Sequence, residues 1–117
     1  YLPWKGFERA WIDRTCIRHP GQVVVHVLPT VIPEVHLRSV RRLHPAFGSL
    51  NGWGVRCHAR NFSIVAASSA VVALPSDKPG GGGTGQGIRI ASDLGKRLLD
   101  LSSEEHRARV KGWVANL

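Results

Sequence analysis

The most regular pattern of hydrophobic positions lies at the C-terminal end of the sequence. Apolar residues recur there at intervals of four, four and three, the spacing of one helix face: Ile90, Leu94, Leu98 and Leu101. Ser102, followed three residues later by Glu105, is typical of a capping box at the start of another helix. The pattern therefore predicts a helical hairpin over residues 88–117.

A shorter amphipathic pattern occupies residues 36–44. Its leucines and its valine recur at a helical interval, and three arginines fall on the opposite face and its flank: Arg38, Arg41 and Arg42. Pro45 ends the predicted helix, because the residue before a proline disfavours helical backbone. We expect a short basic helix here, followed by a loop with a turn at Asn51-Gly52.

The valine-rich segment 22–28 predicts a strand, since β-branched residues favour extended backbone. Pro29 and Pro33 confine any continuation of this strand to an edge or a loop. The uncharged run 64–74 fits a buried strand and a buried helix equally well. Its 11 residues are too few for a membrane-spanning helix, which needs about 20.

A glycine-rich segment, residues 80–87, divides the chain. Three of its glycines satisfy the spacing G-x-G-x-x-G: Gly80, Gly82 and Gly85. A phosphate-binding loop requires a strand, a tight turn and a helix in immediate succession. Pro75 and Pro79 separate the glycines from the preceding apolar run, and Gln86 stands where a Walker motif has lysine. We therefore expect a flexible linker.

These patterns together indicate an α+β fold. Aromatic residues at helical spacing predict an N-terminal helix near Pro3: Trp4, Phe7 and Trp11. We expect a basic α+β region over residues 1–79, β-rich at about 20–75, then the linker and the C-terminal hairpin over 88–117.

The charge balance limits the classes of partner. Sixteen Lys and Arg face eight Asp and Glu, a formal net charge of +8. Arginine dominates, and its planar fork binds phosphate in a bidentate way. No acidic residue occurs between Val35 and Ser76. This composition indicates an anionic partner, although GC-rich coding also enriches arginine.

The basic clusters are the candidate nucleic-acid-binding residues, because arginine and lysine contact phosphates without reading sequence. A solvated surface is the alternative interpretation of the same charges. The predicted contacts are Arg38, Arg41, Arg42, Arg56, Arg60, Arg107, Arg109 and Lys111.

No catalytic, cofactor or metal motif stands out. The histidines are scattered and there is no G-x-S-x-G elbow. Cys16 and His19 have workable zinc spacing, but the adjacent Cys57 and His58 rarely reach one tetrahedral ion together. We expect no cofactor and no metal, and an enzyme is the less favoured class.

The leading hypothesis is a non-enzymatic component of a larger assembly. It would bind RNA within a ribonucleoprotein such as an organellar, mitochondrial ribosome, beside neighbouring proteins. One alternative is an accessory subunit of a membrane-bound respiratory or photosynthetic complex that faces anionic lipid. Another is a small enzyme or ligand-binding domain whose site forms only in space.

Overall fold

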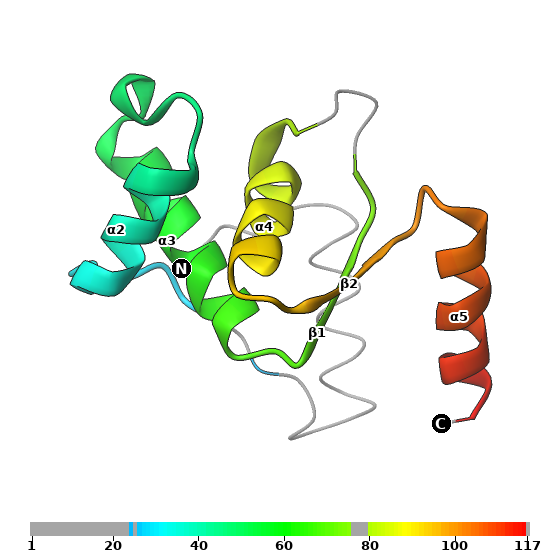
Figure 1. The fold of residues 1–117 in the computed structure, drawn as a ribbon. Helices are drawn as coiled ribbons and strands as arrows, with labels where there is room; N and C mark the ends of the chain where they lie inside the picture. Colours follow the sequence, from blue (N-terminus) through cyan, green and yellow to red (C-terminus); the bar gives the residue numbers. More distant parts are fainter. Residues whose placement is uncertain (1–23, 25, 76–79, 117) are drawn as a thin grey trace.

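Helices and a short parallel sheet make up the fold (Figure 1), and the fold is therefore of mixed α and β character. The computed structural model describes residues 24, 26–75 and 80–116. Its elements in chain order are α2 (Glu34–Leu43), a 3-10 turn (Phe47–Ser49), α3 (Gly52–Ala66), β1 (Ala70–Ala73), α4 (Gly82–Asp93), β2 (Arg97–Asp100) and α5 (Glu104–Ala115).

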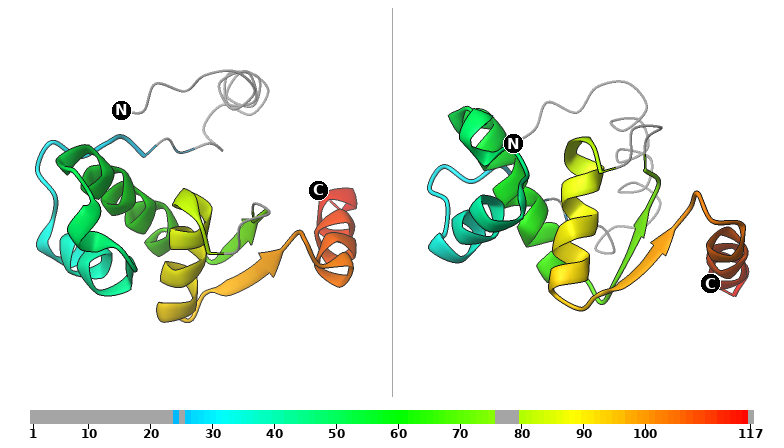
Figure 2. Two further views of the ribbon diagram at one scale, coloured as in Figure 1. Left: turned by 90° about the horizontal axis from the view of Figure 1, so that it is seen from above. Right: turned by 45° about the horizontal axis from the view of Figure 1, so that its top comes forward.

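The centre of the molecule is a β–α–β unit. β1 and β2 pair in parallel, with Ala70 opposite Arg97 and Ala73 opposite Asp100. Parallel neighbours need a crossover connection, and α4 supplies it. Figure 2 shows α2, α3 and α4 side by side, and the sheet lies next to α4. α5 lies at the far end, beyond the sheet. α4 thus stands between the helical layer and the sheet.

The hydrophobic core lies between α3, α4 and the inner face of the sheet. Phe62 and Val65 of α3 pack with Ile90 and Ala91 of α4, and all four are buried. Leu43, Val71 and Leu98 pack against this cluster. The core is therefore made by residues far apart in the sequence.

The predicted basic helix is confirmed as α2. Glu34 lies in its first turn and Arg41 and Arg42 in its last, an arrangement that suits the helix dipole. His44 is extended before Pro45, as the steric conflict with proline requires. Asn51, expected in a turn, instead caps α3 by accepting a hydrogen bond from the Gly54 amide at 2.8 Å.

The predicted helical hairpin is wrong, because β2 lies between the two C-terminal helices. Gly95 adopts φ of +65° and ends α4, while the Lys96 amide donates to the Ala91 carbonyl at 2.8 Å. The chain then becomes extended. Leu98 packs on the core and Leu99 is 1% exposed, so Leu98, which the sequence pattern assigns to a helical face, lies in a strand instead.

Other expectations change as well. The described part of residues 20–75 holds two helices and one strand, so it is not β-rich, and the described residues of the segment 22–28 form no strand. The uncharged run 64–74 contains the end of α3 and all of β1. α5 begins at a Ser103 cap, one residue later than predicted. The predicted N-terminal helix lies outside the described residues.

The expected linker is largely helical. Residues 82–87 form the first turns of α4, while Gly80 and Gly82 adopt φ of +73° and +64°. A Cβ added at Gly85 would overlap the carbonyl group of Gly80. The loop backbone therefore packs directly against the helix, which only a glycine at position 85 allows.

Gly85→Ala should destabilise the protein by about 1–3 kcal/mol, because the added methyl group displaces the loop backbone. Gly87→Ala is the matched control on the same helix, since a Cβ there meets nothing within 4 Å. It should stabilise the protein by about 0.5–1 kcal/mol through helix propensity. Urea denaturation measures both. Equal effects of the two variants would contradict the close packing at Gly85.

Candidate functional site

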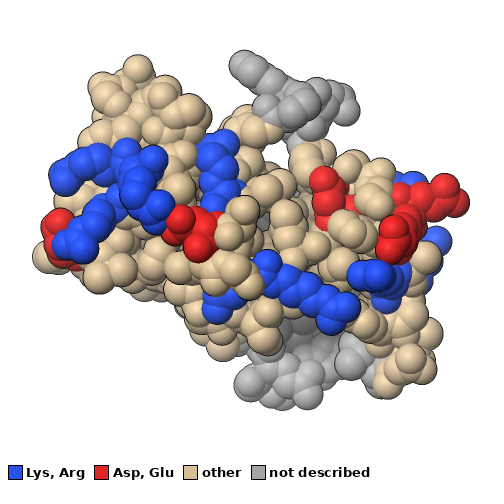
Figure 3. All heavy atoms as spheres, in the orientation of Figure 1, with Lys and Arg blue, Asp and Glu red and all other residues tan. Residues whose placement is uncertain are grey.

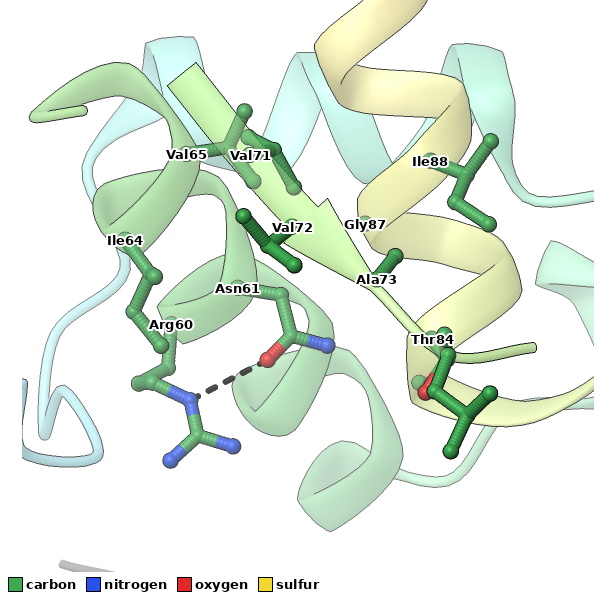
Figure 4. A pocket seen from close by; sticks show the side chains of 12 residues that line it. Arg60, Asn61, Ile64, Val65, Val71, Val72, Ala73, Thr84, Gly87 and Ile88 are labelled. Carbon is green, nitrogen blue, oxygen red and sulfur yellow. Dashed lines mark hydrogen bonds between the residues drawn. The ribbon is translucent and has the colours of Figure 1, made fainter. Parts of the chain in front are cut away.

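A hollow of about 440 Å³ opens between α3, β1 and α4 (Figure 4). This volume lies in the range of small-molecule sites, about 300–1,000 Å³. In the view of Figure 4, Arg60, Asn61 and Thr84 lie towards one end of the hollow. Its remaining wall is mainly aliphatic: Ile64, Val65, Val71, Val72, Leu74 and Ile88. The site thus joins a polar end to an apolar wall.

The start of α4 forms one side of the polar end. The first hydrogen bond of the helix joins the Gly85 amide to the Gly81 carbonyl at 3.1 Å, and no described side chain caps this end. The amides of Gly82, Gly83 and Thr84 therefore lack intrahelical acceptors. Gly83 and Thr84 line the hollow. This end also carries the positive pole of the helix dipole.

Arg60 brings a buried cation to the same end. The residue is 7% exposed, and its Nε donates to Oδ1 of Asn61 at 3.2 Å (Figure 4). Burial lowers the pKa of the Arg60 guanidinium, yet an arginine remains protonated at neutral pH. The described residues that line the hollow include no carboxylate.

Asn61 joins the two sides of the site. A Cβ added at Gly83 would lie 3.4 Å from Nδ2 of Asn61, so the amide group lies close to the first turn of α4. The Arg60 guanidinium, the first-turn amides of α4 and the Thr84 hydroxyl belong to elements that line one hollow. All three are donors, so the arrangement is suited to an anion.

Most of this site was not apparent from the sequence. The two prolines before the glycines argued against a phosphate loop. In the structure β1 ends at Ala73 and α4 begins at Gly82, so the glycines do connect a strand to a helix. The available signal was the order of a valine-rich run, glycines and then Ile90 and Leu94 at helical spacing. Nothing in the pattern pointed to Asn61 or Thr84.

The predicted nucleic-acid residues of α2 are exposed, and some have partners. Nη2 of Arg38 lies 3.9 Å from Glu34, and the Arg41 guanidinium stacks 5.6 Å from the ring centre of Phe47. Both terminal nitrogens of Arg42 donate to Asp93, at 2.8 and 2.5 Å. This pair raises the pKa of Arg42 and lowers that of Asp93.

The other predicted nucleic-acid-binding residues do not form one continuous surface with the arginines of α2. Arg56 donates to the Pro29 carbonyl at 2.8 Å, and Arg60 belongs to the hollow. Arg107, Arg109 and Lys111 lie on α5, at the opposite end of the described fold from α2 (Figures 1 and 2). In the face seen in Figure 3, basic side chains are interspersed with acidic ones.

A histidine pair lies next to the helices that form the site. The rings of His44 and His58 are 4.6 Å apart, and Nδ1 of His44 accepts the Ala46 amide at 3.1 Å. Burial lowers the pKa of both histidines, and the positive charge of Arg89 lowers them further. His58 is also opposed by His44 and Arg60. The pair is therefore neutral at pH 7.

Among the described residues there is neither a cluster of metal-ligating side chains nor a helix that could span a membrane. Its His, Cys, Asp and Glu side chains form no group of three or more that could hold a metal ion. Cys57 is a half-buried free thiol, while Cys16 and His19 lie outside the described residues. Of the helices described, none combines the length and apolar character needed to cross a bilayer.

Comparison of the chain with protein-family models, with curated proteins and with solved structures gives no match. Function is therefore argued from the site alone.

Stability should fall as the pH drops below about 6.5, the ordinary histidine pKa. The folded state holds His36, His44 and His58 at lowered pKa values, so the unfolded chain binds more protons in this window. The stabilising effect is complete above pH 6.5 and is lost as the pH approaches the folded pKa values. Urea denaturation between about pH 7.5 and 5.5 measures it.

His58→Gln should flatten this dependence, because the half-buried ring no longer titrates. Two results would contradict a contribution of the histidine pair to the pH dependence of stability. One is an unchanged dependence of the unfolding free energy on pH in His58→Gln, and the other is no dependence in the unsubstituted protein.

Proposed function

We propose that this protein binds a small molecule that carries a phosphate group. The observation that supports this proposal is that buried Arg60 and the first turn of α4 line the same hollow. The phosphate would accept hydrogen bonds from the first-turn amides, the Thr84 hydroxyl and the guanidinium. A helix N-terminus that follows a strand is a general solution for phosphate.

The remainder of the ligand would lie along the aliphatic wall. Val72, Leu74 and Ile64 are 47%, 66% and 40% exposed, so an organic group placed there would cover apolar surface. A nucleotide has this division into an anionic group and a flat ring. We therefore take nucleotides as the first class of ligand to test.

The distribution of charge favours phosphate over a neutral ligand. The Arg60 guanidinium lines the hollow, and its positive charge attracts a ligand of opposite charge. Arginine forms paired hydrogen bonds with phosphate oxygens. The first turn of α4 consists mainly of glycine, so few side chains of the helix itself stand beside its amides.

Arg60→Ala should weaken AMP binding by about tenfold to a hundredfold, since a hydrogen bond to a charged group contributes about 1.5–3 kcal/mol. Thr84→Val should weaken binding less, and because Thr84 is exposed this variant should fold normally. Isothermal titration calorimetry with AMP and with inorganic phosphate measures both.

Arg97→Ala is the matched control, since it removes the same charge from an exposed residue on β2 that does not line the hollow. It should leave AMP affinity unchanged. Equal losses in Arg60→Ala and Arg97→Ala would indicate attraction by overall charge. Absence of binding by the unsubstituted protein would overturn the proposal.

RNA binding within a ribonucleoprotein is the second proposed function. It is supported by the exposed face of α2, where Arg38 and Arg41 are accessible and Trp53 of the neighbouring α3 is 49% exposed. Arginines would contact phosphates, and the indole could stack on a base. The membrane-complex and enzyme hypotheses stay predictions.

RNA affinity should fall steeply with salt if this second function holds, because bound phosphates release counterions. Arg38→Ala combined with Arg41→Ala should reduce the salt slope by about 1.4, since each phosphate neutralised on single-stranded RNA accounts for about 0.7. Filter binding to a single-stranded RNA across a salt series measures this. A flat salt dependence would contradict RNA binding, and an unchanged slope would exclude α2 as the RNA-binding surface.

A further inference from the structure

Arg89 of α4 makes a fork of hydrogen bonds beside the site. Its Nη1 donates to the Gly80 carbonyl at 2.8 Å. Its Nε and Nη2 donate to Oε1 of Gln86 at 3.1 and 2.8 Å. Gln86 is fully buried, so the guanidinium is held by an acceptor that has little freedom to move.

The hydrogen bond to Gly80 holds the loop where its backbone conformation requires glycine and where it packs closely on α4. Gly80 adopts φ of +73°, and its carbonyl lies over Gly85, where a Cβ would overlap it. A carbonyl oxygen carries partial negative charge and would repel an anion at the start of α4. The hydrogen bond from Arg89 offsets part of this negative charge and fixes the direction of the carbonyl.

We propose that Arg89 is a positioning residue of the anion site. It is absent from the residues that line the hollow, so it acts through the Gly80 loop. By holding that loop on α4, it would fix the backbone that leads into the first-turn amides. The inference rests on the proposed function for its effect on binding, whereas its effect on the loop can be measured without a ligand.

Substitution by lysine distinguishes a positioning role of Arg89 from a contribution of its positive charge. Lysine keeps the positive charge but is a single point donor, so it cannot bridge Gly80 and Gln86 in the same way. Arg89→Lys and Arg89→Ala should therefore behave alike if Arg89 positions the loop. If it contributes charge alone, Arg89→Lys should retain affinity.

Lys96→Ala is the matched control. Nζ of Lys96 donates to the carbonyls of Ala66 and Ser68, at 3.2 and 2.7 Å, so it is also a cation that holds backbone carbonyls. It lies beyond the other end of α4. The control variant removes comparable hydrogen bonds without touching the glycine loop.

The first measurement is amide hydrogen exchange in the full chain without ligand. The reporter is the Gly85 amide, which bonds to the Gly81 carbonyl at 3.1 Å. Both Arg89 variants should exchange this proton about fivefold faster or more, because the loop opens locally. Lys96→Ala should leave it unchanged. Unchanged exchange in the Arg89 variants would overturn the inference.

The second measurement is AMP affinity by calorimetry. Both Arg89 variants should lose about tenfold, equivalent to about 1.4 kcal/mol, and Lys96→Ala should lose nothing. Retained affinity in Arg89→Lys would overturn the positioning role. If the unsubstituted protein binds no AMP, the proposed function fails, and the exchange result alone still decides whether Arg89 holds the loop.

Discussion

The close approach of the Gly80 backbone to α4 at Gly85 is the constraint on which the rest of the structure depends. It fixes the backbone at the entrance to α4, which begins at Gly82. Because α4 then runs back across the sheet, β2 can pair in parallel with β1. The first turn of this helix also lines the candidate site, and so the fold and the site depend on the same contact.

The positions of the charged side chains say more about this protein than its net charge does. The net charge of +8 suggests a uniformly basic surface, yet several surface cations already have partners. Arg42 pairs with Asp93, and Arg109 lies 3.2 Å from Glu105. Exposed pairs of this kind contribute little to stability, because water screens their charges. Arg60 differs because it is buried at a hollow, where its charge is least screened by water.

The two proposed functions use different parts of the molecule. A phosphate-bearing ligand would occupy the polar end of the hollow, and RNA would lie along α2. The histidine pair and Arg89 lie between these regions, where α2, α3 and α4 meet. The lowered pKa values of the two histidines come first from burial at this position, so they reflect the packing of the fold rather than either proposed binding surface.

Local signals in the sequence determined the elements that depend on neighbours along the chain. The amphipathic spacing and Pro45 defined α2, and the serines near residue 102 indicated the start of α5 to within one residue. Only the tertiary structure decided that Leu98 and Leu99 belong to a strand, because parallel pairing with β1 is a distant contact that helical spacing can imitate. The site followed the same rule. The glycines were visible in the sequence, but their role required β1 before them and Arg60 beside them, and packing alone brings these together.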